Sequence, residues 1–396
     1  MNIIEYVEKK GIYTFEEKPF CEVDSLVISQ LSYLKFLGIL PGPAVNNAGI
    51  ILSDILDNEN YNLLYRDERY EEINGKFFTA LCNSRRFGHL LLNNFIDIID
   101  DNLDIQFSAM SVSDSCGFNY IVFRGTDDSV VGWKEDLNMT FKIPVPAQKY
   151  SVDYLKKVAG NISGKFYVGG HSKGGNLAVY SSMNTEKEIR DRIIRIFSHD
   201  GPGFRAELIR ESHYDEIKDR IVKFVPKSAV VGLFGNLEAF EVVDCEKRGV
   251  KQHNPYNWII DGFEFKRAEH VSKYSLLKAE AINSWACEMT KEQWEVLSDS
   301  LFGALEEAGI TNLNDFNDDI IKTLSKLKVA ADSVDSDNID KIKSMLALFR
   351  ECAKAVAKED ANEHVMHAEK VIMQTINDKT KGSIKNKIKR KETNAE

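Results

Sequence analysis

Residues 166–178 read Phe-Tyr-Val-Gly-Gly-His-Ser-Lys-Gly-Gly-Asn-Leu-Ala, and the fold that we expect for the chain follows from this stretch. An apolar run leads into Gly170-His171-Ser172-Lys173-Gly174, after which small residues open a helical pattern. Strand, sharp turn and helix in this order are the context that a G-x-S-x-G nucleophile elbow requires. Ser172 is therefore the candidate nucleophile.

Steric and electrostatic requirements explain the spacing of this motif. Glycine is needed at Gly170 and Gly174, because a side chain at either place would strike the neighbouring strand or helix. The helix that begins after Ser172 directs its free N–H groups and its positive dipole end at the oxygen that becomes charged during attack. His171 stands beside the nucleophile, and we expect its side chain to pack away from the hydroxyl.

The chain around the motif alternates between strand and helix patterns. Strands are expected at about 105–112, 120–123, 166–168, 193–197, 221–225 and 239–243, with helices at about 150–160, 173–183 and 204–219. This alternation predicts a mostly parallel sheet with helices on both faces. In such sheets the ligand site lies at the carboxyl ends of the strands, where Thr126, Ser172 and Asp200 all fall.

Helical patterns flank this central region. We expect helices over residues 1–10, from Asp24 or Ser25 to Leu37, and again between about 46 and 102. From about residue 266 the chain is rich in Ala, Glu, Lys and Leu with helical periodicity. The predicted organisation is an N-terminal helical region that packs on or caps the core (1–103), an α/β core (104–265), a C-terminal helical region (266–378) and a basic, disordered tail (379–396).

Composition argues against several classes of function. The net charge of −10 over 396 residues is unfavourable for general nucleic-acid binding. There is no run of about 18 apolar residues, and acidic residues interrupt the N-terminal apolar stretch, so we expect neither a membrane span nor a signal peptide. The six scattered cysteines form no C-x-x-C pair, and we expect free thiols in a reducing cytoplasm. We expect no metal or cofactor, since His364 and His367 have no evident third ligand.

A serine hydroxyl becomes a strong nucleophile when a base removes its proton and an acid orients that base. In hydrolases with this elbow the chain order is nucleophile, acid, histidine. That order favours His253, on the loop after the last expected strand, as the base. His199, next to Asp200, is expected to line the pocket.

Three positions compete for the acid. Asp200 closes the strand after the elbow helix, and it is our preferred candidate, the alternative being a purely turn-forming role before Gly201-Pro202-Gly203. One strand later, where a carboxylate is more usual, the chain has Ser228. Asp244 follows the last strand as a third candidate. The acid therefore stays open between Asp200, Asp244 and none.

The oxyanion hole needs two donors aimed at the developing charge. One is expected to be the backbone N–H of Lys173, the residue after the nucleophile. The other is expected from Thr126, on the loop after an earlier strand, with Asp136 bracing that loop.

The motifs together resemble a known family. Phe123-Arg124-Gly125-Thr126, followed by Trp133 and Asp136-Leu137, looks with the elbow like the class 3 lipase branch of the α/β-hydrolase fold. More closely, three further segments resemble an uncharacterised bacterial family of lipase-like hydrolases: Asp24-Ser25-Leu26, Asp200-Gly201-Pro202-Gly203 and 252–258. The resemblance covers about residues 10–265, and the sequence departs from the pattern at Lys173 and Ser228.

This resemblance implies an α/β-hydrolase fold and serine esterase or lipase chemistry through an acyl-enzyme. It implies Ser172 as nucleophile, His253 as base and Thr126 in the oxyanion hole, acting on a small-molecule acyl ester or lipid. A thioester or an amide is a less favoured substrate. A second hypothesis is a catalytically weak or inactive hydrolase-fold protein that serves as a binding or scaffold module, with its C-terminal helices docking a partner protein.

Overall fold

The computed structural model describes residues 1–43, 48–66, 70–127, 129–139, 142–235, 238–276, 279, 283 and 290–307. The chain divides into two compact units, one of residues 1–127 and 143–283 and the other of residues 128–142 and 284–396. In the second unit the described helices are α4 (Val130–Asn138) and α11 (Lys291–Glu307). Helix α11 lies where a helical pattern was expected, whereas the rest of the C-terminal pattern beyond residue 307 and the basic tail lie outside the described residues.

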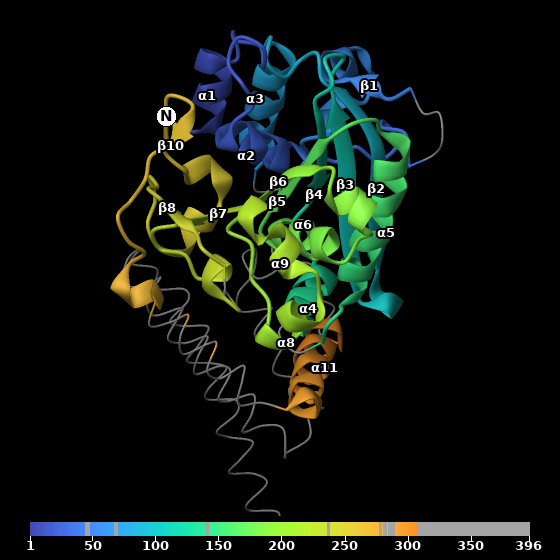
Figure 1. Ribbon diagram of the computed structural model, residues 1–396, viewed down its shortest axis with the longest axis vertical. Helices are drawn as coiled ribbons and strands as arrows, with labels where there is room; N and C mark the ends of the chain where they lie inside the picture. Colours follow the sequence, from blue (N-terminus) through green and yellow to red (C-terminus); the bar gives the residue numbers. More distant parts are fainter. Residues whose placement is uncertain are drawn as a thin grey trace, which may run out of the picture. The chain divides into compact units, whose positions relative to one another are not determined.

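An eight-stranded sheet forms the centre of the first unit (Figure 1). Its strands follow the chain order: β1 (Ile50–Ile51), β2 (Leu91–Asp100), β3 (Ile105–Ser113), β4 (Asn119–Phe123), β5 (Phe166–His171), β6 (Ile193–His199), β7 (Ile221–Pro226) and β8 (Glu241–Val243). Strands β1 to β4 pair antiparallel, and β4 to β8 pair parallel. With helices on both faces this is an α/β-hydrolase fold, so the expected fold class is confirmed.

Alternation along the strands gives each face of the sheet its own core. In β4, Tyr120 and Val122 belong to one core, while Ile121 and Phe123 belong to the other. The first core is shared with α1 (Ile3–Lys10), α2 (Glu22–Leu31) and α3 (Glu71–Cys82). The second is shared with α5 (Pro146–Asn161) and α6 (Lys173–Met183), the helix that follows the elbow. Every residue of α6 is buried, which fits a helix packed tightly against the sheet.

The helical pattern expected up to residue 102 is wrong in its last part, because residues 91–100 form β2 in the sheet. Leu92, Phe95, Ile96 and Ile99 have the three- and four-residue spacings of a helix, which hid the period of two. The structure shows why: Asn94 has a φ of 55° at a break in the pairing of β2 with β3. This β-bulge shifts the alternation of side chains by one residue.

Helix α2 is also shorter than expected. It begins at Glu22 and ends at Leu31, not at Leu37. Asp24 lies inside its first turn, where Oδ2 accepts a hydrogen bond from the backbone N–H of Cys21 at 2.9 Å. Asp24 thus satisfies a free N–H group at the start of the helix from the third helical position, and neither Asp24 nor Ser25 is the residue that precedes the helix.

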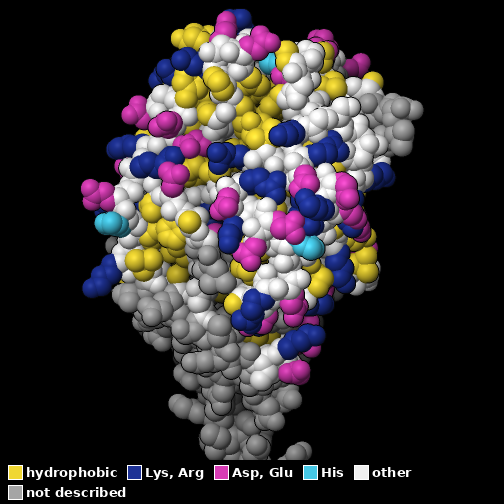
Figure 2. Space-filling view, viewed as in Figure 1, with side chains coloured by type: hydrophobic (Ala, Val, Ile, Leu, Met, Phe, Trp, Pro, Cys, Tyr) yellow, Lys and Arg dark blue, Asp and Glu magenta, His cyan; other side chains and the backbone are white. Residues whose placement is uncertain are grey.

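Short elements complete the first unit. They are η1 (Leu52–Asp57), η2 (Tyr61–Leu63), η3 (Asp101–Leu103), α7 (Lys187–Arg190), α8 (Ala206–Glu211), α9 (Tyr214–Ile217), η4 (Lys218–Arg220), η5 (Val231–Leu233), η6 (Gly249–His253), η7 (Pro255–Asn257), β9 (Ile260–Asp261) and β10 (Glu264–Phe265). None of the described helices has the length and apolarity to cross a bilayer. On the face seen in Figure 2, acidic and basic side chains are interspersed among hydrophobic ones.

Candidate active site

Ser172 is the single residue between β5 and α6. Its φ of 58° and ψ of −131° lie in a region that residues other than glycine rarely adopt. Hydrogen bonds hold this turn from both sides, since Ser172 N donates to His199 O and Gly175 N donates to Ser172 O, each at 2.9 Å. A strained serine on a strand-to-helix turn is the geometry of a nucleophile elbow.

The glycines of the motif permit a very close approach of α6 to the sheet. A side-chain carbon on Gly170 would collide with the carbonyl group of Gly174. One on Gly174 would collide with the carbonyl oxygen of Phe123, the last residue of β4. Because these obstacles are backbone atoms, no side-chain movement could relieve them. The steric requirement inferred from the spacing is therefore present in the structure.

Asp200 and His253 meet at the carboxyl end of the sheet. Asp200 follows β6 with a φ of 51°, and its Oδ2 lies 2.6 Å from His253 Nδ1. Its Oδ1 accepts a hydrogen bond from Gly232 N at 3.0 Å. A carboxylate only accepts, so Nδ1 of the His253 ring carries a proton and Nε2 is the atom turned away from Asp200.

The exposure of this pair differs in a way that suits catalysis. The Asp200 side chain is 1% exposed, whereas that of His253 is 29% exposed. Among the described residues, no hydrogen bond involves Ser172 Oγ or His253 Nε2. Neither atom is therefore committed to another group of the described chain, and catalytic hydrogen bonds often form only in the complex with substrate.

The other positions considered for the acid are engaged elsewhere. Asp244 Oδ2 pairs with Lys266 Nζ at 2.9 Å, and the hydrogen bond from Lys266 lowers the pKa of Asp244. The backbone N–H of Ser228 donates to Gln252 Oε1 at 2.6 Å. Of the three candidate positions, the structure therefore brings Asp200 to His253.

The loop proposed for the oxyanion hole leaves β4 from a well-anchored residue. Arg124 is 4% exposed and donates to both carboxylate oxygens of Asp97 in β2, at 3.1 and 2.9 Å. Its backbone N–H donates to Ser108 O of β3 at 2.9 Å. Gly125 and half-buried Thr126 follow directly. The start of this loop is thus tied to two neighbouring strands.

Lys173 departs from the pattern of the resemblance, and its side chain has a structural explanation. It is 1% exposed, and its Nζ donates to Gln106 O and Gln106 Oε1 at 2.8 and 2.6 Å. The ammonium group is therefore bound to β3, while the backbone N–H stays at the first position of α6.

His199 does not line a pocket, contrary to expectation. It is fully buried, with the rings of Phe197 and Phe224 stacked on it at centroid distances of 6.1 and 5.8 Å. Its Nε2 lies 2.8 Å from Ser25 Oγ. Burial lowers the pKa of His199 to about 3, so the ring is neutral at pH 7. His199 belongs to the core under the site.

Two contacts of the site could not be found by motif. Gly232 anchors Asp200 from η5, and Tyr33 lies against the elbow, with its hydroxyl 2.9 Å from His171 Nδ1. Neither residue has a distinctive sequence context. In the part of the chain that the structure describes, no three His, Cys, Asp or Glu side chains are arranged to hold a metal ion. His364 and His367 lie outside that part.

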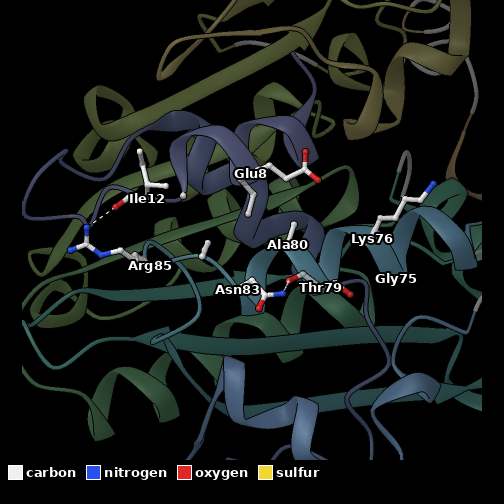
Figure 3. Close-up of a pocket in the computed structure, with 11 residues that line it drawn as sticks. Glu8, Ile12, Gly75, Lys76, Thr79, Ala80, Asn83 and Arg85 are labelled. Carbon is white, nitrogen blue, oxygen red and sulfur yellow. Dashed lines mark hydrogen bonds between the residues drawn. The ribbon is translucent and has the colours of Figure 1, made fainter.

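A cavity of about 630 Å³ lies elsewhere in the first unit, between α1 and α3 (Figure 3). Its lining includes Val7, Ile12 and Ala80, and it contains none of the candidate site residues. Two polar side chains of its wall are bonded to the backbone, since Arg85 Nη1 donates to Ile12 O and Asn83 Nδ2 donates to Thr79 O. This cavity is distinct from the site around Ser172.

The chain was compared with protein families and with known structures. A family model described as Mbeg1-like matches residues 81–303, which include Ser172, Asp200 and His253. The native Rhizomucor miehei lipase propeptide complex is 16% identical with a TM-score of 0.29, and the match covers 40% of this chain and 58% of that one. The M37 lipase is 16% identical with a TM-score of 0.34, over 54% and 69% of the two chains. The chain thus spans less than two thirds of the Rhizomucor structure, and no curated protein matches it.

Proposed function

The chain belongs to the Mbeg1-like family, and we propose that it is a serine hydrolase that cleaves a carboxylic ester through an acyl-enzyme intermediate. One observation carries this proposal. A strained Ser172 stands at the end of β5, and at the end of the neighbouring strand a buried carboxylate holds His253 by a 2.6 Å hydrogen bond. A serine, a histidine and a carboxylate that orients the histidine are the three groups by which a serine hydroxyl is activated.

In the proposed reaction, Nε2 of His253 takes the proton of Ser172 Oγ as the oxygen attacks the ester carbonyl. The C–O bond to the alcohol then breaks, and His253 returns the proton to the departing alcohol oxygen. Water repeats the sequence on the acyl-serine and releases the carboxylic acid. Asp200 keeps the imidazole in the required tautomer and stabilises the imidazolium that forms in each step.

The developing negative charge on the carbonyl oxygen needs donors that are already in place. The backbone N–H of Lys173 is one, and the start of α6 adds the positive end of a helix dipole. Thr126 supplies the second on a loop whose first residue, Arg124, is anchored to β2 and β3. Preorganised donors of this kind cost no reorganisation when the charge appears.

Labelling with a fluorophosphonate tests the nucleophile directly. We expect the intact protein to be labelled and to hydrolyse short acyl esters, and Ser172→Ala to lose labelling and to lose turnover by a factor on the order of 10⁴ to 10⁶. Ser182→Ala is the matched control, since Ser182 lies in the same helix and its Oγ donates to Ala178 O. It should keep both signals.

An unlabelled intact protein, or equal labelling of the Ser172→Ala variant, would contradict the proposal. That result would favour the alternative of a hydrolase-fold binding or scaffold protein. For a labelled protein, a series of acyl esters of increasing chain length measures the depth of the acyl site and separates small esters from lipids as substrates. The cytoplasmic location stays a prediction from the sequence.

A further inference from the structure

His171, the residue immediately before the nucleophile, links the elbow to the loop that carries His253. Its side chain is buried, and its Nε2 lies 2.8 Å from the carbonyl oxygen of His253. The two imidazole rings are 4.6 Å apart between centroids. The residue before the serine therefore contacts the backbone of the residue proposed to activate that serine.

The partners of this ring determine where its proton lies. A carbonyl oxygen only accepts, so His171 Nε2 is protonated and donates to His253 O. Burial, with His253 as a second cause, lowers the pKa of His171 well below its ordinary value, and the ring is neutral at pH 7. Nδ1 is then an acceptor, and the Tyr33 hydroxyl at 2.9 Å is its donor. Both ring nitrogens of His171 are thus satisfied in one defined tautomer.

The Tyr33 hydroxyl lies beside Gly125, at the start of the loop proposed for the oxyanion hole. A side-chain carbon on Gly125 would collide with the Tyr33 hydroxyl and would lie 3.1 Å from Ser172 Cβ. The hydroxyl, the oxyanion loop and the nucleophile are therefore neighbours. The Tyr33 hydroxyl donates to His171 Nδ1, and His171 Nε2 in turn donates to the carbonyl oxygen of His253.

The loop that carries His253 needs such an anchor. Asp200 holds the His253 ring at one atom, Nδ1, and a ring held at one atom can still swing about that bond. The segment itself is a short 3₁₀ turn, η6, and the carbonyl of the preceding Gln252 is held by Trp258 Nε1 at 2.8 Å. A second hydrogen bond, from His171 Nε2 to the carbonyl oxygen of His253, fixes the backbone from which that ring projects.

We propose that His171 and Tyr33 are positioning residues: together they hold the backbone of His253 so that its Nε2 faces Ser172. This inference rests on the proposed serine hydrolase function. The position x in the G-x-S-x-G motif would then set the geometry of the base, in addition to completing the turn. The position of the base strongly affects the rate of the reaction, since a misplacement of about 1 Å can lower a rate on the order of 100-fold.

The experiment compares His171→Leu, His171→Gln and Tyr33→Phe with the intact full-length protein. The Gln side chain keeps an N–H donor for the His253 carbonyl, and Leu does not. We measure the rate and the final extent of fluorophosphonate labelling, and kcat and KM on a short acyl ester. His213→Leu is the control, because His213 is an exposed histidine whose Nδ1 contacts Glu216.

We expect His171→Leu to be labelled to the same final extent but about 100-fold more slowly, with kcat lowered and KM nearly unchanged. His171→Gln should recover most of the labelling rate. Tyr33→Phe should lower that rate about tenfold, since without the Tyr33 hydroxyl the tautomer of His171 is no longer fixed. His213→Leu should behave like the intact protein.

Different failures have different meanings. If the intact protein is labelled and His171→Leu is labelled equally fast, the inference is overturned while the proposed function stands. If His171→Leu and Tyr33→Phe lower the final extent of labelling and leave the rate of the labelled fraction unchanged, both residues serve folding, and the inference is again overturned. If the intact protein is not labelled, the proposed function and the inference fall together.

Discussion

The carboxylate of Asp200 is buried and contacts His253, and this distinguishes it from the other acidic candidate. Oδ1 is held by the backbone of Gly232 and Oδ2 by His253, while the residue itself adopts a positive φ of 51°. Asp244 is instead paired with Lys266 on a more exposed part of the molecule. A fixed, buried carboxylate can orient an imidazole, whereas an acid neutralised by a lysine cannot serve the same ring.

Substitution of these two aspartates separates their roles. We expect Asp200→Asn to lower kcat by a factor on the order of 10⁴, because an amide favours the wrong tautomer of His253. Asp244→Asn should lower kcat by less than about threefold, since it removes only a partly exposed ion pair. Steady-state ester hydrolysis measures both. Equal losses in the two variants would mean that Asp200 does not orient the base.

The N-terminal helices are held to the segment before β2 by one buried guanidinium group. Arg86 and Asp24 of α2 have side chains with no solvent exposure, and Arg86 Nη2 donates to Asp24 Oδ2 at 2.5 Å. Arg86 Nη1 also donates to the carbonyl oxygens of Tyr13, Thr14 and Lys18. A single side chain therefore organises the whole connection between α1 and α2.

The adjacent arginines provide a matched test of this role. We expect Arg86→Met to lower the free energy of unfolding by about 3–5 kcal/mol, because it removes the ion-pair partner of the buried Asp24 carboxyl group. Arg85→Met should cost less than about 1 kcal/mol, since the Arg85 side chain is 64% exposed and pairs with Glu17 at 3.6 Å. Urea denaturation at pH 7 compares the two. Similar losses would argue against the organising role of Arg86.

On the scale of the molecule, buried histidines couple the stability of the first unit to pH. His199 lies among aromatic rings with its pKa lowered to about 3, while an unfolded chain has an ordinary value near 6.5. The unfolded state therefore binds a proton first as the pH falls. The contribution of neutral His199 to the free energy of unfolding is fully present above about pH 6.5. It is lost progressively between pH 6.5 and pH 3.

This linkage predicts the effect of replacing His199. Between pH 7 and pH 5 the intact protein should lose about 2 kcal/mol of unfolding free energy on account of His199 alone. His199→Gln cannot titrate, and its amide can still bond to Ser25 Oγ, so its loss over the same range should be smaller by about that amount. Urea titrations at the two pH values give the difference. An unchanged pH dependence in the variant would show that His199 is not the group that titrates.

The elbow and most of the core elements could be predicted because their causes are local. Residues 166–178 contain the apolar strand, the glycines and the small residues of the helix within one short stretch, and α6 ends at Met183 as expected. The strands β3 to β7 follow from apolar runs of the right length. Strand β2 did not, because the bulge at Asn94 broke its alternation and only pairing with β3 reveals it.

What the sequence by itself determined was therefore the nucleophile candidate, the α/β fold class and the presence of a histidine after the last strand of the sheet. Tertiary structure alone decided which carboxylate meets that histidine, that His199 faces the core, and that Tyr33 and His171 contact the elbow and the His253 loop. The physical reason is the distance along the chain. Asp200 and His253 are 53 residues apart, Tyr33 and His171 are 138 apart, and only the assembly of the sheet and of the segments packed against it brings such residues together.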